Sequence, residues 1–357
     1  MSLLKSIFLS SHVSWMHQPG YTIRFKSIVA SMVGAVAIAS VAAMPSMAAD
    51  PFRPAASASN IDEQTEQAFY EMFRDGDYQA ARQRLAASNP SDPLAYAMSA
   101  AFSYLDNDLV TLNTRAEQTL TAARQLETSD PLRSHLYKAV GHFMEGAYIF
   151  ESETGLTKIP KTLAKLNDVL SNMRAAERID ETDPELNLLK GFMDLQIAVA
   201  LPRSNPEDAI RQLETYGAPD YLVNRGIAIA YRDLEQYNNA LDYVNAAIED
   251  TAIAAPSVNN PDLQYLRGQI LRNQSDDLEG EASQVALKQS ISNFKQAFNR
   301  RGQMPDELAL DLGYELCRAR FKRDSPDASA AQNNANKDRC KDWSAQKVAN
   351  PADTASQ

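Results

Sequence analysis

The stretch GIAIAYRDLEQYNNALDYVNAAI occupies residues 226–248, and it decides the fold. Its first half places apolar residues at helical spacing, and Gln236 interrupts the pattern before a second amphipathic segment begins. In that second segment the small Ala240 is followed four residues later by Val244, and three residues after that by the small Ala247. Small side chains on one stripe let a neighbouring helix approach closely, while the larger one fills its groove. We therefore expect two helices packed as an antiparallel pair.

The same small–large–small pattern recurs in the second helix of most expected pairs. The matching sets are Ala81, Leu85 and Ser88; Ala116, Leu120 and Ala123; Ser290, Phe294 and Ala297; Ala209 and Leu213, with a larger Tyr216; and, more loosely, Val169, Met173 and Ala176. The first helices carry a mid-length glycine instead, at Gly141, Gly191, Gly268 and Gly313. Because glycine inside a helix costs about 1 kcal/mol relative to alanine, four such glycines indicate helices whose backbones touch.

This series of motifs resembles the tetratricopeptide repeat family. The best-matching unit is residues 226–248, and the first unit carries the family's turn at Gly76-Asp77-Tyr78. The resemblance covers residues 62–322 and implies an all-α, right-handed α-solenoid of about six irregular helix pairs plus a closing helix. The mid-helix small residues are spaced 31 to 50 residues apart, which is wider and less uniform than the family's repeat. We therefore expect an irregular stack with a break near residues 151–159.

The helix boundaries are marked by helix-start residues such as Asn205-Pro206-Glu207. The sequence predicts thirteen helices, over residues 62–74, 78–88, 93–105, 109–127, 132–150, 160–178, 184–200, 206–216, 219–234, 237–250, 261–273, 283–300 and 305–322.

Residues 1–49 have the organisation of a secretory signal peptide. Arg24 and Lys26 precede an uncharged apolar run of 17 residues, and small residues follow it up to Ala49. We expect cleavage near Ala49, so that the mature chain begins at Ala49 or Asp50. The alternative is a retained membrane anchor, since the run is close to the shortest length that spans a bilayer. The position of the true start codon stays open.

The remaining chain is expected to be soluble and exported, with residues 50–61 as a Pro- and Ala-rich linker. Residues 1–49 hold three of the 35 basic residues and none of the 46 acidic ones, so the rest carries a net charge of −14. This acidic balance disfavours nucleic acid as a partner. The chain as a whole resembles exported tetratricopeptide proteins of photosynthetic bacteria, a group that implies no particular activity. The resemblance favours the periplasm or the thylakoid lumen, with membrane contact only through export or a membrane-associated partner.

The sequence contains no motif typical of an enzyme, a cofactor site or a metal site. A phosphate-binding Gly-rich loop, Gly-x-Ser-x-Gly, His-Glu-x-x-His and Cys-x-x-Cys are all absent. His135 and His142, the two histidines after the leader, share a helix face with Lys138 and Glu145. The helix rise separates these histidines by about 10.5 Å, which is too far for one ion. We expect a protein without catalytic residues, metal or cofactor, in which the histidines contact a ligand or lie on ordinary surface.

Cys317 and Cys340 are the only cysteines in the chain. In an exported protein an isolated pair favours a disulfide, and two free thiols are the alternative. The bond would attach the polar tail, residues 323–357, to the last expected helix and stabilise the fold by about 3 kcal/mol. Six basic residues cluster near the end of the chain, and four of them fall in the last turns of a helix, where they complement the helix dipole or, alternatively, meet an anionic partner. They are Arg300, Arg301, Arg318, Arg320, Lys322 and Arg323.

The expected architecture predicts a non-enzymatic scaffold that binds another protein or peptide in the concave face of a superhelix. By resemblance to the family, first-helix residues line that face: Tyr70, His135, Lys138, His142, Glu145, Phe192, Arg225, Arg232, Tyr265, Arg272 and Asn273. Arg225, Arg232 and Arg272 would form a row that attracts a carboxylate-bearing partner. The alternative is that these arginines pair with neighbours such as Asp233 and Glu235.

A helical solute-binding protein, which presents a small ligand to a membrane transporter, is the other function considered. A closed apolar cavity lined from several helix pairs would favour it, whereas an open polar and aromatic trough would favour the scaffold. The sequence identifies neither the partner nor the oligomeric state.

Overall fold

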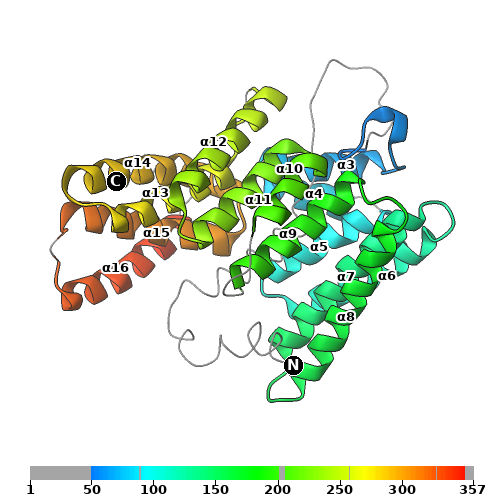
Figure 1. The fold of residues 1–357 in the computed structure, drawn as a ribbon. Helices are drawn as coiled ribbons and strands as arrows, with labels where there is room; N and C mark the ends of the chain where they lie inside the picture. The colour runs from blue at the N-terminus through cyan, green and yellow to red at the C-terminus, as the bar shows by residue number, and fades with distance from the viewer. Residues whose placement is uncertain (1–49, 88–89, 201–205, 257, 327, 350–357) are drawn as a thin grey trace. The chain divides into compact units, whose positions relative to one another are not determined.

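The computed structural model describes residues 50–87, 90–200, 206–256, 258–326 and 328–349. Within these ranges all regular structure is helical, and fourteen α-helices, α3–α16, follow one another along the chain (Figure 1). The expectation of an all-α protein is therefore confirmed. Contacts divide the chain into two compact units, the first ending at Val223 and the second beginning at Asn224, except that the short segment Arg74–Ala80 belongs to the second.

The first unit is a series of helices in which each helix from α5 to α9 packs on the next, and α3 packs on α5. They are α3 (Glu63–Phe69), α4 (Tyr78–Ala87), α5 (Pro93–Leu105), α6 (Leu109–Gln125), α7 (Pro131–Ser152), α8 (Lys158–Glu177), α9 (Pro184–Ala200) and α10 (Glu207–Tyr216). A π-helical turn, Tyr70–Arg74, continues α3. The longest two, α7 and α8, run alongside each other over their length (Figure 1). Residues 151–159, where the sequence suggested a break, join these two helices inside the first unit.

The second unit repeats the arrangement with α11 (Asp220–Asp233), α12 (Tyr237–Ala254), α13 (Pro261–Asp277), α14 (Gly280–Phe298), α15 (Asp306–Asp324) and α16 (Ala330–Ala349). The first turn of α11 belongs to the first unit. Helix α13 packs on both α12 and α14, and α15 packs on both α14 and α16. The core lies between α13, α14 and α15 and is built around Phe294 and Phe298.

Most first helices begin with an Asp or Asn followed by proline. The Asp92 and Asp183 carboxylates accept hydrogen bonds from the backbone N–H groups of Leu94 and Leu186, at 2.8 and 2.9 Å. The same arrangement starts α7 at Asp130 and α13 at Asn260. A side-chain acceptor at the N-cap satisfies an N–H that the helix leaves unpaired, and proline at the first turn has none to satisfy. These starts agree with the sequence prediction to within one or two residues.

The mid-helix glycines lie against the large residues of the neighbouring second helices. A Cβ atom added at Gly191 would lie 2.3 Å from Leu213 of α10, and one added at Gly268 would lie 2.4 Å from the Phe294 ring of α14. A Cβ added at Gly141 would lie 2.7 Å from a third large residue, Leu120 of α6. Glycine and large side chain are therefore complementary across each contact, which is why both recur at fixed places in the sequence. The alanines expected at helix contacts are also buried, namely Ala81, Ala116, Ala209, Ala240, Ala247 and Ala297.

Residues 50–61, expected to be a linker, are docked on the first unit. Phe52 and Ile61 are buried, and the Phe52 ring meets Phe69 of α3 edge-on, with ring centres 6.0 Å apart. These two apolar residues anchor a segment whose overall composition is that of a flexible connection. We call residues 50–61 the N-terminal strap.

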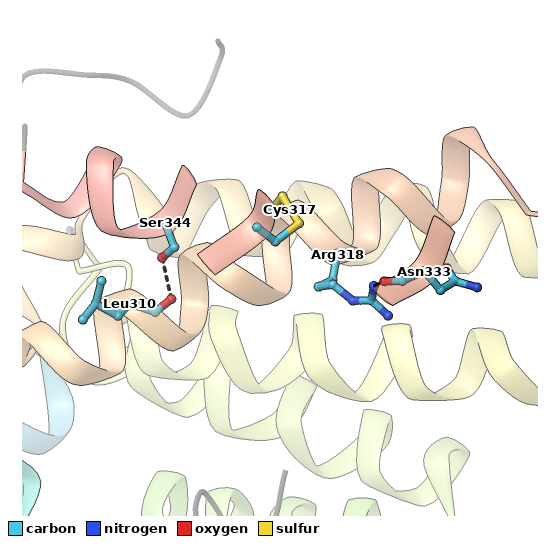
Figure 2. Close-up of a disulfide and its surroundings, with 6 residues drawn as sticks. Leu310, Cys317, Arg318, Asn333 and Ser344 are labelled. Carbon is cyan, nitrogen blue, oxygen red and sulfur yellow. Dashed lines mark hydrogen bonds between the residues drawn. A yellow bond between two sulfur atoms is a disulfide. The ribbon is translucent and has the colours of Figure 1, made fainter. Parts of the chain in front are cut away.

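The tail 323–357, expected to be polar and to be attached by a disulfide, contains helix α16, which the sequence analysis did not predict. Cys317 of α15 and Cys340 of α16 are joined by a disulfide with Cα atoms 5.4 Å apart (Figure 2). Trp343 stacks on Phe298 with ring centres 5.7 Å apart. The helix therefore has one covalent and one apolar attachment to the second unit.

Polar contacts also fix α16, and the basic cluster supplies several of them. Figure 2 shows Ser344 Oγ donating to the Leu310 carbonyl oxygen at 2.6 Å, and Arg318 donating to the Asn333 carbonyl oxygen at 3.0 Å. The other contacts are Arg301 Nε to the Lys347 carbonyl oxygen at 3.2 Å and the Arg320 guanidinium over the Trp343 ring at 5.4 Å. These basic residues therefore hold the last helix pair together.

The predicted signal peptide, residues 1–49, lies outside the described residues. Among the helices that the structure does describe, none is both long and apolar enough to cross a membrane.

Candidate functional site

The aromatic residues predicted to line the binding face do not offer exposed contact area. Tyr70, Phe192 and Tyr265 are all buried. The Tyr70 hydroxyl donates to Glu66 one turn earlier, at 2.7 Å. A buried ring cannot contact a partner that arrives from solution. These rings therefore stabilise the packing of the helices instead.

His135 and Lys138 of α7 contact other parts of the first unit. The His135 Nδ1 atom lies 3.2 Å from the Asn172 Oδ1 atom of α8. Lys138 Nζ donates to Glu127 Oε1, just after α6, at 2.6 Å. Both side chains are partly buried, and each connects α7 to a neighbouring part of the chain.

His142, Glu145 and Lys165 form a small charged group between α7 and α8. His142 Nδ1 lies 2.9 Å from Glu145 Oε2, and Lys165 Nζ donates to the same oxygen at 2.6 Å. Partial burial raises the pKa of Glu145, but the hydrogen bonds from His142 and Lys165 outweigh it and hold that pKa below its usual value. Among the described residues no group of His, Cys, Asp and Glu side chains is arranged to hold a metal ion.

In the second unit, the predicted Arg232 and Tyr265 belong to a chain of hydrogen bonds between three first helices, which runs through two residues that were not predicted, Gln269 and Glu315. Arg232 Nη1 of α11 donates to Gln269 Oε1 of α13 at 2.7 Å, and Gln269 Nε2 donates to Glu315 Oε1 of α15 at 2.9 Å. The Tyr265 hydroxyl donates to the same Glu315 oxygen at 2.9 Å. Burial, and next the Glu315 charge, raise the pKa of Tyr265, so this hydroxyl remains a donor.

A second group of polar contacts lies farther along α13 and α15. Lys322 Nζ donates to Ser275 Oγ at 2.8 Å and pairs with Asp276. Arg272 donates to the neighbouring Asn273 Oδ1 at 3.1 Å and lies 4.0 Å from Asp276. The side chains of Arg272 and Asp276 are 35% and 53% exposed, so this end is open to a partner. We call the whole set the polar row: Arg232, Tyr265, Gln269, Arg272, Asp276, Glu315 and Lys322.

The arginine row expected from the sequence is balanced by carboxylates. Arg232 pairs with Asp233 at 3.0 Å, the alternative raised in the sequence analysis. Arg225 lies 3.6 Å from Asp262, whose carboxylate also accepts from the Tyr78 hydroxyl. The polar row therefore has mixed charge, and only Arg272 of the three arginines has a substantially exposed side chain.

The first unit contains a second polar group, which sequence reasoning missed. Arg133 of α7 donates through both Nη atoms to Asp92 at 2.9 and 3.0 Å, and through Nε to Glu185 of α9 at 3.1 Å. The Tyr137 hydroxyl donates to the other Glu185 oxygen at 2.6 Å. One arginine thus connects the starts of α5, α7 and α9.

The N-terminal strap completes this group. Arg53 donates to Asp183 at 2.8 and 2.9 Å and to Glu185 at 3.0 Å, and it pairs with Asp50 at 2.7 Å. Burial raises the pKa of both Asp183 and Glu185, although the arginines oppose that rise. We call these seven residues the buried charge cluster: Asp50, Arg53, Asp92, Arg133, Tyr137, Asp183 and Glu185.

A signal for these sites is present in the sequence. An acidic residue follows the cap and proline in Asp183-Pro184-Glu185 and again in Asn260-Pro261-Asp262. In both places that acid meets an arginine of the preceding first helix, Arg133 or Arg225. The repeated position, rather than either residue type alone, indicates the pairing.

An apolar cavity lies between α7, α8 and α9, lined by residues that include Met144, Met173 and Met193. Its volume is about 10 Å³, which is room for about one water molecule. This cavity does not accommodate a solute, so it gives no support to the solute-binding alternative.

No protein-family model matches the chain, and no match was found among curated proteins.

Proposed function

We propose that the protein is an exported, non-enzymatic scaffold that binds another protein or a peptide along the first helices of tetratricopeptide-like pairs. The polar row carries this proposal, because it joins hydrogen-bonding groups of α11, α13 and α15 and includes the exposed side chains of Arg272 and Asp276 farther along α13. Stacked helix pairs commonly bind partners along such continuous surfaces.

The complementarity of mid-helix glycines and large residues supports the repeat assignment on which this proposal depends. Gly191 with Leu213 and Gly268 with Phe294 belong to different units, yet they occupy equivalent places in their helix pairs. We propose that each unit is a right-handed stack of such pairs, with α16 as the last second helix. Export, with cleavage near Ala49, is part of the same proposal.

The mixed charge of the polar row favours a polar partner that offers both donors and acceptors. A carboxylate of the partner would meet Arg272 or Lys322, and an amide or amine would meet Asp276 or Glu315. This requirement is met by an extended peptide backbone with occasional charged side chains. The proposed partner contact is therefore polar and includes charges of both signs.

A site-specific photo-crosslinker tests the proposal. We would place it at Arg272 in the polar row, and at Lys288, an exposed residue of the second helix α14, as a matched control. Crosslinking in the native compartment should give a discrete adduct from position 272 that is absent from position 288. Changing Asp276 and Lys322 to alanine should remove that adduct. Equal labelling from both positions, or none from position 272, would contradict the proposal.

A further inference from the structure

The buried charge cluster has more negative than positive groups. The cations that pair with its carboxylates among the described residues are Arg53 and Arg133. The carboxylates number four: Asp50, Asp92, Asp183 and Glu185. No side chain among these six is more than 8% exposed. With every group ionised, the cluster carries a formal charge of −2 in a place that water hardly reaches.

Such an excess is unfavourable, because four carboxylates share two cations, and like charges repel one another more strongly in a buried place than in water. Burial raises the pKa of Glu185, and the negative charges of Asp50 and Asp183 raise it further, against the opposing effect of the two arginines. These three carboxylates therefore lie close enough to repel one another. A third cation at this place would relieve the repulsion.

The chain itself can supply that cation at Asp50. This residue directly follows Ala49, after which the leader is expected to be cleaved. Asp50 as a whole is buried, main chain included. Its carboxylate accepts from the backbone N–H groups of Phe52 and Ser59, each at 2.8 Å, which fixes the strap in a tight loop. Bond lengths keep the Asp50 nitrogen within about 4 Å of the same carboxylate.

We propose that cleavage between Ala49 and Asp50 creates an α-ammonium group that becomes the third cation of the buried charge cluster. Hydrolysis adds one water molecule across the Ala49–Asp50 peptide bond, leaves a carboxylate on Ala49 and gives Asp50 an amine. At neutral pH the amine takes a proton, so the formal charge of the cluster changes from −2 to −1. A neutral amide in the precursor thus becomes a charged partner in the mature protein.

The proposal distinguishes between the two cleavage positions considered from the sequence. If cleavage follows Ala48, the charge lies on Ala49, about 3.8 Å farther along the chain than the Asp50 position. Cleavage after Ala49 places the charge on the residue that already belongs to the cluster. Processing then also completes the attachment of the N-terminal strap to α9, because Arg53 and the new ammonium share the same carboxylates.

The inference rests on the proposed export, and one experiment separates the two. The full chain is expressed in a bacterium that exports it, and the processed protein is sequenced from its amino terminus. It is then treated with an amine-acetylating reagent at pH 6.5, both folded and in urea, and the α-amine product is quantified by mass spectrometry. We expect a terminus at Asp50 whose amine reacts about tenfold or more slowly in the folded protein, as a rise of one pKa unit would cause.

Each other outcome overturns the inference. A terminus at Ala49, or an Asp50 amine that reacts equally in the folded and unfolded protein, refutes it while export stands. An intact leader refutes both the inference and the proposed processing.

Two cluster variants and one control test the electrostatic cause. Glu185→Gln removes one negative charge, so the ammonium is less stabilised and its labelling in the folded protein should accelerate about threefold or more. If Glu185→Gln does not fold, Asp183→Asn serves, because asparagine can still accept from the Leu186 N–H. Asp338→Asn, at a side chain that is 80% exposed, should leave the rate unchanged. Equal labelling rates in cluster variant and control would refute the inference.

Discussion

Glu185 of α9 accepts a hydrogen bond from Arg133 of α7 at 3.1 Å, and neither side chain is more than 1% exposed. The two residues are 52 positions apart in sequence. Since Arg133 also pairs with Asp92, its loss would leave the buried Asp92 carboxylate without its cation and Glu185 with Arg53 as its remaining cation among the described residues. The contact therefore ties three helix starts into one cooperative group.

We predict that Arg133→Met lowers the free energy of unfolding by about 3–5 kcal/mol, as expected when one partner of a buried ion pair is removed. Lys341→Met is the matched control, because Lys341 also forms an ion pair but its own side chain is 65% exposed. The control should lose less than about 1 kcal/mol. Urea denaturation measures both, and a loss from Arg133→Met as small as that of the control would contradict the prediction.

The second prediction concerns pH. Burial raises the folded-state pKa of Glu185 above its ordinary value of 4.5. The folded protein then binds more protons than the unfolded chain between these two values, so its free energy of unfolding falls as pH rises through that interval. In Glu185→Gln, the free energy of unfolding should therefore fall less steeply as pH rises above 4.5. Urea denaturation at a series of pH values would test this.

Glu145 provides the control for the pH experiment, because its pKa is shifted in the opposite direction. Burial raises this pKa, but the hydrogen bonds from His142 and Lys165 lower it below 4.5 overall. Its stabilising effect is present above pH 4.5 and is lost as pH falls below that value. Glu145→Gln should therefore change the profile only on the acidic side. Identical profiles for the two variants would contradict the assignment.

The third prediction concerns the glycine contacts. Gly268→Ala should destabilise the protein by about 1–3 kcal/mol, because the new methyl group overlaps the Phe294 ring. Phe294→Leu in the same chain should recover part of that loss. Gly146→Ala on α7 should stabilise by up to about 1 kcal/mol, since its Cβ would meet only Lys165 at 3.4 Å. Thermal denaturation of the four proteins would test the helix register, and equal effects at positions 268 and 146 would disprove it.

The fourth prediction concerns the disulfide. Replacing Cys317 and Cys340 with serine should lower the free energy of unfolding by about 3 kcal/mol in the chain-entropy account. Trp343 is the only tryptophan after residue 49, so its fluorescence reports on α16 alone in the processed protein. We expect its emission to shift to the red in the variant and its quenching by iodide to increase. Unchanged emission and stability would mean that the noncovalent contacts suffice.

The sequence predicted thirteen of the fourteen described α-helices because their apolar spacing and start residues are local signals. Asp183-Pro184 and Asn260-Pro261 mark helix starts without any knowledge of the rest of the chain. Helix α16 was missed because its residues are mostly polar and alanine, and because Cys340, Trp343 and Ser344 gain their meaning only from partners on other helices.

The candidate sites were less predictable, because burial of a charged residue depends on tertiary packing. Arg232 and Tyr265 were placed on first helices, yet both are buried and bonded within the second unit. Arg133 was not predicted as a site residue, since arginine is usually exposed. In the structure Arg133 is among the most buried large side chains. Helical periodicity identifies which face a residue occupies, but it does not show whether the neighbouring helix places a residue of opposite charge against it.

The bond between Cys317 and Cys340 also determines how the second unit responds to a mechanical load. A force applied to the chain beyond Cys340 is transmitted to α15 through the sulfur atoms. The segment between the two cysteines, which are 23 residues apart, is therefore not extended. That segment keeps about 8 nm of contour length out of the extension. With the disulfide intact the unit would not release this length even when fully unfolded, whereas reduction would add it to the extension. A single-molecule stretching experiment would therefore distinguish the oxidised from the reduced protein by the total extension on unfolding.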